Sequence, residues 1–188
     1  MNENFKKQIS EIEDLTEIAD IVSASTELKE SISSFYKEPY APLFSSESHK
    51  IPMYFRKKGD TIYLIGDYKR EDDDNSSTVE VILDAAENKL VESALTVSRA
   101  GLFQGLIEAC AIMKLGFDIT SDSEVCDKEF LFKDGNQAIL VSVDETKESE
   151  FVNYICNNAV EITLLGHVTK GELRLDDLSF GYIEDFIG

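Results

Sequence analysis

The segment Ser98-Arg99-Ala100-Gly101 has the residue types that could hold a phosphate. It stands between a predicted short strand, residues 94–98, and a strongly apolar predicted helix, residues 102–113. Free backbone N–H groups at a helix N-terminus, together with a guanidinium, suit a bound anion. In the simpler alternative, Ser98 only caps the helix and Arg99 is solvated. The pattern allows a phosphate site without requiring one.

Other reactive residue types lack the spacing that their chemistry needs. The acidic run at residues 71–74 offers the oxygen ligands of Mg²⁺ or Ca²⁺, but a calcium loop counted from Asp72 has Leu83 where the bidentate Glu belongs. Cys110 lies in an apolar segment, and nothing in the sequence brings His167 to it. We therefore expect a solvated acidic loop and a buried structural thiol.

Familiar metal and phosphate motifs are absent from the sequence. Neither G-x-x-x-x-G-K-[ST] nor G-x-G-x-x-G occurs. The 3 cysteines form no C-x-x-C pair, and 2 histidines do not complete a zinc site at the usual spacings. The sequence therefore predicts no resident metal and no disulfide framework.

Length and charge limit the classes of protein to which the chain can belong. A chain of 188 residues with 43% hydrophobic residues is expected to build one core. The formal net charge of -19 would repel a nucleic-acid backbone or an anionic membrane at long range. No apolar run approaches a membrane span, and the first residues do not resemble a signal peptide. We expect a cytoplasmic protein that binds neither nucleic acid nor membrane.

Residues 1–50 are predicted to form a helical hairpin followed by a linker. Apolar residues recur every three or four positions, as in an amphipathic helix, first over residues 5–22 and again over residues 28–36. Small polar residues at 23–25 separate the two stretches, and Pro39 prevents continuation of the second.

Residues 51–188 are predicted to form an α+β domain, with a mixed or antiparallel sheet covered by helices. The predicted elements are a β-hairpin of residues 53–55 and 61–65, a helix started by a capping box of Ser77 and Glu80, the strand and buried helix named above, a strand at 139–141, a helix at 151–155, a strand at 160–164, a closing hairpin at 173–175 and a terminal helix at 180–186.

Several blocks from about residue 51 onward resemble the last domain of phosphoribosylformylglycinamidine synthase. The blocks occur in family order over about three quarters of the chain. They are Phe55-Arg56-Lys57-Lys58-Gly59-Asp60-Thr61-Ile62-Tyr63-Leu64-Ile65-Gly66, Gly116-Phe117-Asp118-Ile119-Thr120, Phe130-Leu131-Phe132, Val141-Ser142-Val143 and Leu165-Gly166-His167-Val168-Thr169. The resemblance implies the C-terminal fold of the aminoimidazole ribonucleotide synthetase-like superfamily, in which a partner half binds ATP.

The chain departs from the family where the family does its chemistry. The family turn His-Asp-x-Ser-acid-Gly-Gly corresponds to residues 95–101, which keep Ser98 and Gly101 but not the His, Asp or acid. A second pattern, Leu-Phe-Gly-Glu followed by an Arg, has Lys133 in place of its glycine and Ala138 in place of its arginine. A glutaminase elbow of the Gly-x-Cys-x-Gly kind is also missing.

From these departures we expect a non-catalytic relative of the synthase domain, which acts as a binding or interaction module linked to purine biosynthesis. Two alternatives stay open: a split subunit of an active ATP-dependent synthase, and a sensor of a phosphorylated small molecule such as a ribonucleotide. ATP and Mg²⁺ are expected only if another polypeptide supplies the ATP-binding half. The N-terminal helices are expected to cover the domain, or to bind a second copy or a partner protein. The candidate ligand-binding residues are Ser98, Arg99, Gly101 and Lys133, with no catalytic residue.

Overall fold

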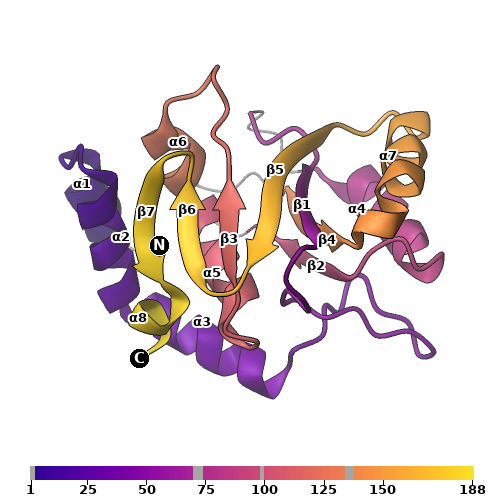
Figure 1. Ribbon diagram of the computed structural model, residues 1–188, viewed down its shortest axis with the longest axis horizontal. Helices are drawn as coiled ribbons and strands as arrows, with labels where there is room; N and C mark the ends of the chain where they lie inside the picture. The colour runs from indigo at the N-terminus through magenta and orange to yellow at the C-terminus, as the bar shows by residue number, and fades with distance from the viewer. Residues whose placement is uncertain (1–2, 70–73, 98–99, 134–137) are drawn as a thin grey trace.

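The computed structural model describes residues 3–69, 74–97, 100–133 and 138–188 (Figure 1). Its centre is a seven-stranded sheet in the order β2-β4-β1-β5-β3-β6-β7. The strands are β1 (Thr61–Ile65), β2 (Ser93–Thr96), β3 (Gly116–Ile119), β4 (Ile139–Val143), β5 (Ile162–Thr169), β6 (Glu172–Leu175) and β7 (Leu178–Tyr182). Neighbouring strands are antiparallel except for the parallel pair β3 and β6. The predicted α+β class with a mixed sheet is confirmed.

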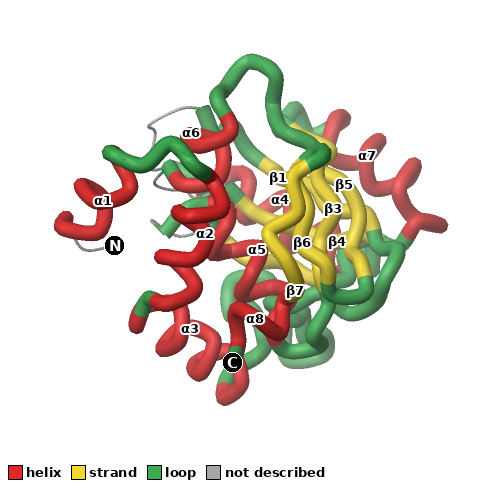
Figure 2. Tube along the Cα trace, turned by 60° about the vertical axis from the view of Figure 1, so that its left-hand side comes forward, coloured by secondary structure: helices red, strands yellow, loops and turns green. Residues whose placement is uncertain are grey.

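Helix α5 (Leu102–Ala111) lies at the centre of the larger core. All of its residues are buried, in agreement with the prediction of a helix buried on several sides. Around it, on one face of the sheet, lie α2 (Leu15–Ala24), α3 (Thr26–Lys37), α6 (Asp127–Phe132) and α8 (Ile183–Ile187). Figure 2 shows these helices together on one side of the sheet. Because α5 is buried along its whole length, the core fixes the position of its N-terminus.

The opposite face of the sheet is covered over β2, β4 and β1. Helices α4 (Ser76–Glu87) and α7 (Glu148–Asn157) pack there on a second core that includes Tyr63, Ile82 and Phe151. The capping box predicted for Ser77 and Glu80 is wrong. The N-cap of α4 is Asn75, two residues before Ser77, and it makes no side-chain capping bond. A short 3-10 turn, Glu145–Lys147, leads into α7.

The N-terminal helices differ in one respect from the prediction. A single helix was expected over residues 5–22, but the structure has α1 (Glu3–Ser10) and α2, separated by a short turn. The cause is Asp14, whose carboxylate accepts hydrogen bonds from the backbone N–H of Thr16 and of Glu17 and so caps a new helix. Ser25 ends α2 and caps α3, as expected for the small residues there.

The β-hairpin predicted from residues 53–55 and 61–65 is wrong. Residues 61–65 form β1, but both edges of this strand are occupied, by β4 and β5. The segment 51–55 therefore runs outside the sheet, where Phe55 N–H donates to the carbonyl of Ala109 and Met53 N–H to that of Pro39. Tertiary pairing overrides the local β-propensity here.

The C-terminal part agrees with the prediction in outline. The predicted closing hairpin exists as β6 and β7, while β3 lies between β6 and β5. The terminal helix starts at Ile183 and not at Phe180, because β7 continues to Tyr182. Within the described parts of the chain, no helix is both long and apolar enough to cross a lipid bilayer.

Candidate functional site

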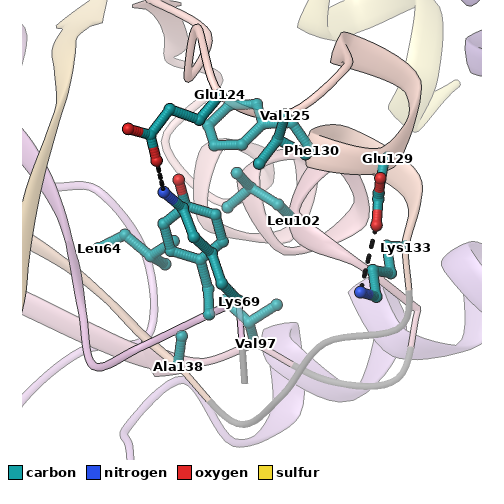
Figure 3. Close-up of a pocket in the computed structure, with 11 residues that line it drawn as sticks. Leu64, Lys69, Val97, Leu102, Glu124, Val125, Glu129, Phe130, Lys133 and Ala138 are labelled. Carbon is teal, nitrogen blue, oxygen red and sulfur yellow. Dashed lines mark hydrogen bonds and ion pairs between the residues drawn. The ribbon is translucent and has the colours of Figure 1, made fainter. Parts of the chain in front are cut away.

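A cavity of about 270 Å³ opens beside the N-terminus of α5 (Figure 3). Segments far apart in the sequence meet there: the end of β1, the loop after it, the end of β2, the start of α5, the segment before α6, α6 itself and the start of β4. The described lining residues are Leu64, Tyr68, Lys69, Val97, Leu102, Glu124, Val125, Glu129, Phe130, Lys133 and Ala138.

The interior of the cavity is apolar. Leu64 and Val97 come from strand ends, Leu102 is the first residue of α5, and Phe130 lies in α6. Leu102, Phe130 and Val125 lie together in Figure 3. The side chains of these residues from the strand ends, α5 and α6 are buried, so their packing in the core holds this wall of the cavity in place. An apolar interior with few polar groups at its rim is the usual form of a small-molecule site.

One charged cluster lies on the side of the cavity formed by the loop after β1. The Lys69 ammonium lies 2.7 Å from the Glu124 carboxylate and 3.1 Å from that of Asp122, and the Tyr68 hydroxyl donates to Asp122. These hydrogen bonds lower the pKa of Asp122 to about 2, the Tyr68 bond being the largest cause. The hydrogen bond to Glu124, and after it that to Asp122, raises the pKa of Lys69 above its usual range. Both partners are therefore charged at neutral pH.

A second charged pair lies on α6. The Lys133 ammonium is 3.2 Å from the Glu129 carboxylate, one helical turn away. Lys133 ends α6 and keeps nearly half of its side chain exposed. An exposed pair of this kind contributes less than about 1 kcal/mol, so the Lys133 side chain can exchange Glu129 for another anion at little cost.

Two of the four predicted site residues meet at this place. Gly101 is the N-cap of α5 and has a positive φ of 91°. A Cβ atom at this glycine would lie 2.9 Å from the carbonyl oxygen of Lys133 and 3.0 Å from that of Leu131. The start of α5 and the end of α6 therefore touch, and Lys133 reaches the cavity beside Leu102. Ser98 and Arg99 lie outside the described residues.

The other candidates from the sequence have structural roles where they are described. Cys110 is fully buried in α5, and burial raises the pKa of its thiol well above the usual value. His167 is exposed on β5, opposite Thr61 and Asp118 of the neighbouring strands, so it is not beside that thiol. Asp74 accepts hydrogen bonds from Ser76 at the start of α4. Among the described residues, no cluster of His, Cys, Asp and Glu is arranged to hold a metal ion.

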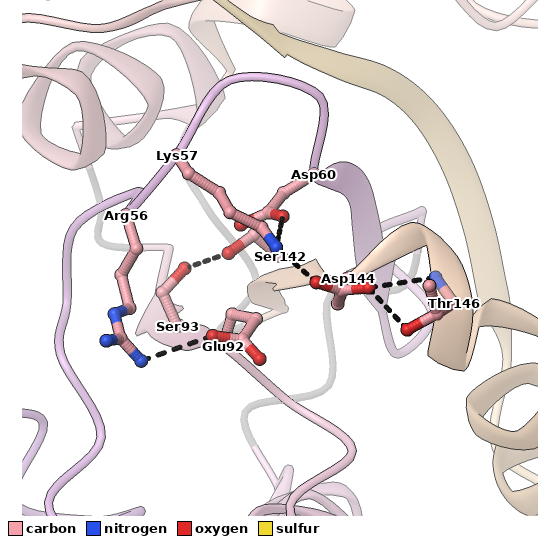
Figure 4. A network of polar contacts seen from close by, with 8 residues as sticks. All are labelled: Arg56, Lys57, Asp60, Glu92, Ser93, Ser142, Asp144 and Thr146. Carbon is pink, nitrogen blue, oxygen red and sulfur yellow. Dashed lines mark hydrogen bonds and ion pairs between the residues drawn. The ribbon is translucent and has the colours of Figure 1, made fainter.

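A second polar cluster surrounds Asp60, the residue before β1 (Figure 4). Asp60 is completely buried, and the Lys57 ammonium lies 3.7 Å from its carboxylate. Burial raises the pKa of Asp60 to about 6. Lys57 also donates to Asp144, a residue that caps the turn before α7 by accepting from Thr146. None of these residues lines the cavity, and the cluster joins the loop before β1 to the end of β4.

Chemically, the cavity is suited to binding. Its described carboxylates, Glu124 and Glu129, are both paired with lysines, and its described lining includes no imidazole or thiol. Sequence reasoning missed Tyr68, Lys69 and Glu124, because an ion pair between residues 55 positions apart leaves no local pattern. The pair of Glu129 and Lys133 did have a signal, the helical i, i+4 spacing.

Known proteins resemble the chain in sequence. The subunit PurL of phosphoribosylformylglycinamidine synthase from Carboxydothermus hydrogenoformans is 30% identical over 152 residues, which cover 69% of this chain and 21% of the relative. PurL from Leuconostoc mesenteroides is 30% identical over 140 residues, covering 63% and 18%. The chain thus spans about a fifth of the length of these curated relatives. No family model matches it.

Solved structures share the fold. Thermotoga maritima PurL complexed with FGAR has a TM-score of 0.64 at 13% identity, covering 76% of this chain and 30% of that one. Phosphoribosylformylglycinamidine synthase II of the same organism has a TM-score of 0.66 at 13% identity, covering 89% and 35%. Thiamine-monophosphate kinase from Stenotrophomonas maltophilia has a TM-score of 0.55 at 12% identity, covering 70% and 54%. The sequence relatives confirm the resemblance to the synthase family inferred from sequence blocks, and the solved structures confirm the shared fold.

Proposed function

We propose that this chain, which carries a PurL-related domain of the aminoimidazole ribonucleotide synthetase-like fold, is a non-catalytic binding module linked to purine biosynthesis. The observation that carries the proposal is the cavity at the N-terminus of α5, with its apolar wall and its paired charges. In this proposal residues 51–188 form the binding unit, and residues 1–50 form a cover for α5.

Loss of catalysis is supported by the residues that replace the family's polar turn. Leu95 stands where the family has a histidine, and it is buried in the core behind β2. Thr96, at the end of the same strand, stands where the family has an aspartate. Neither side chain can act as a general acid or base at neutral pH. The two described carboxylates of the cavity, Glu124 and Glu129, are each paired with a lysine.

A phosphorylated ribonucleotide is the ligand class that we propose for the cavity. Lys69 and Lys133 provide two ammonium groups at the rim, and an ammonium makes strong charge-assisted hydrogen bonds to phosphate. The apolar wall suits the base or sugar. Solved structures of Thermotoga maritima PurL complexed with FGAR and with ATP make these two compounds, together with ADP and aminoimidazole ribonucleotide, a reasonable first panel.

Thermal unfolding with this panel tests the proposal. A ligand present at about 100 times its dissociation constant should stabilise the full chain by about 2.7 kcal/mol. Lys133→Gln is expected to weaken that ligand about tenfold by removing one charged hydrogen bond. Lys29→Gln, an exposed change on α3, is the control and should bind as the wild type does. Absence of any shift across the panel would contradict a ribonucleotide site.

A second candidate function is that of a split subunit in an active synthase. It is favoured by a neighbouring structure described as PurLQS from Thermotoga maritima, with a TM-score of 0.64. ATP-dependent amidine formation from formylglycinamide ribonucleotide and ammonia, after mixing with an ATP-binding polypeptide, would support it, and no turnover in that mixture would support the non-catalytic module.

The N-terminal helices could cover the chain's own core or bind a second copy or a partner protein. Their apolar residues, among them Ile18, Leu28 and Phe35, belong to the chain's own core. A homodimer or a partner complex through these helices would therefore form on their outer, polar faces. We propose the covering role as the main one, since it buries Ile18, Leu28 and Phe35.

A further inference from the structure

A second depression, which we call the basic hollow, lies beside the edge strand β2 and has a volume of about 180 Å³. It shares no described residue with the cavity at α5. Its walls come from the segment before β1, the turn after α4, the start of β2 and the turn before α7. The lining residues are His49, Lys50, Ile51, Pro52, Arg56, Lys89, Val91, Glu92 and Lys147.

The charge of the basic hollow is opposite to that of the chain. Acidic residues outnumber Lys and Arg by 37 to 18 overall. Four of those 18 cations, Lys50, Arg56, Lys89 and Lys147, nevertheless line this one depression. The only carboxylate among its described lining residues is Glu92. Cations gathered in a concave surface create a local positive potential that attracts anions, even on an acidic protein.

Most of this positive charge is not neutralised within the described chain. Arg56 lies 3.2 Å from Glu92, a contact shown in Figure 4. The Lys147 ammonium donates to the backbone carbonyl of Lys89, a neutral acceptor. Among the described residues, neither Lys50 nor Lys89 has a carboxylate partner for its ammonium. Binding of an anion would therefore satisfy donors that the fold leaves available.

The walls of the basic hollow are held by the core. Ile51 and Val91 are buried beneath it, and Ala94 N–H donates to the carbonyl of Pro52, which ties the first wall to β2. Lys147 N–H donates to the carbonyl of Asp144 at 2.8 Å, so the turn that carries its side chain is also fixed. A site whose backbone is already ordered loses less entropy when a ligand binds.

We propose that the basic hollow binds a phosphate group, either free phosphate or the phosphate of a small monoester. Lysines and an arginine that line one depression from three separate segments suit a compact anion of more than one charge. A single chloride would use only part of this donor set. The proposal is independent of the ligand of the larger cavity.

The test measures thermal unfolding of the full chain in inorganic phosphate and in potassium chloride of the same ionic strength. Phosphate is expected to raise the unfolding temperature further than chloride, with saturation. The double variant Lys89→Gln/Lys147→Gln should weaken phosphate at least tenfold. The double variant Lys29→Gln/Lys170→Gln, which removes the same charge from exposed positions elsewhere, should bind phosphate as the wild type does. Equal shifts in the two salts, or an unchanged affinity in the first double variant, would overturn the proposal.

Two further arms identify the site and the source of the phosphate. Lys133→Gln should leave phosphate binding unchanged, because Lys133 lines the other cavity; a tenfold loss in this variant would place the anion there and refute the basic hollow. Ribose 5-phosphate that binds more tightly than inorganic phosphate, and loses affinity in Lys89→Gln/Lys147→Gln, would identify a monoester site. Affinity equal to or weaker than that of inorganic phosphate would identify a site for free phosphate.

Discussion

At the scale of single residues, Asp60 has the clearest dependence on pH. It is fully buried, no described residue donates a hydrogen bond to its carboxylate, and its pKa is raised to about 6. Below about pH 4 the carboxyl group is protonated in the folded and the unfolded chain alike, whereas above about pH 6 the folded chain must hold a buried charge. Ionisation of Asp60 therefore lowers the free energy of unfolding as the pH rises between these values.

Asp60→Asn should remove this decrease in the free energy of unfolding with rising pH. The free energy of unfolding of the variant, relative to the wild type, is expected to rise by about 2–3 kcal/mol between about pH 4 and about pH 7.5, as measured by urea denaturation. Asp144→Asn is the matched control. Hydrogen bonds, first that from Lys57, lower the pKa of Asp144, so its stabilising effect is lost only below the usual aspartate range. A constant difference for Asp60→Asn across the window would contradict this account.

Gly101 tests the contact between α5 and α6. Gly59→Ala is its control, because both glycines have φ near 90° but only Gly101 has backbone against it. The left-handed backbone alone should cost about 1–2 kcal/mol in Gly59→Ala. The added methyl group in Gly101→Ala must also displace the Lys133 carbonyl, so a further loss of about 1–3 kcal/mol is expected by chemical denaturation. Equal losses in the two variants would argue against a close contact.

Some residues of the cavity at α5 could be predicted from the sequence, and others could not. Gly101 and Lys133 were selected from separate family-like blocks, and the structure brings them together. Tyr68 and Lys69 were not found, since their partners Asp122 and Glu124 reach them only through the fold. Local spacing can predict a helical pair or a cap, but it carries no information on two loops that meet in space.

At the scale of elements, helices α2 and α3 belong to the main core. Ile18 in α2 and Leu28 in α3 are both completely buried. Ser31 of α3 donates to the buried Glu108 of α5 at 2.5 Å, and Gln104 donates to the same carboxylate at 2.9 Å. This polar contact fixes the position of α3 on α5 in addition to the apolar packing.

Truncation of a core side chain in α2 tests the covering role. Ile18→Ala is expected to lower the free energy of unfolding by about 2–5 kcal/mol, the usual cost of a buried isoleucine replaced by alanine. Lys29→Ala, on the exposed side of α3, should change it by less than about 0.5 kcal/mol. A small effect of Ile18→Ala in urea denaturation would mean that the N-terminal helices are dispensable for the fold.

Elements with strong periodicity were predictable, and those decided by one contact were not. The largely apolar pattern of α5 identified a buried helix. The break between α1 and α2 depends on the single carboxylate of Asp14, which interrupts an otherwise continuous apolar stripe. The segment at residues 53–55 has β-forming residues, but β4 and β5 occupy both edges of β1, and a sequence pattern cannot show which edges are occupied.

At the scale of the whole molecule, the net charge of -19 opposes the compact state. Salt screens this repulsion, with a Debye length that falls from about 30 Å at 0.01 M to about 8 Å at 0.15 M. The unfolding temperature should therefore rise with sodium chloride, and a gain of about 1 kcal/mol would correspond to about 2–4 °C. Chloride is the salt of choice, because phosphate would also occupy the basic hollow. An unfolding temperature that falls with added chloride would contradict net self-repulsion.

Amide chemical shifts during titration with formylglycinamide ribonucleotide, Mg²⁺-ATP and ammonium chloride test directly whether the cavity at the start of α5 is a non-catalytic binding site. The ammonium salt supplies the nitrogen that amidine formation requires. We predict saturable shifts that cluster at Val97, Leu102, Phe130, Lys133 and Ala138, with no conversion of the ribonucleotide over the course of the experiment. Shifts confined to residues outside the cavity, or formation of the amidine product by this chain alone, would contradict a non-catalytic binding module.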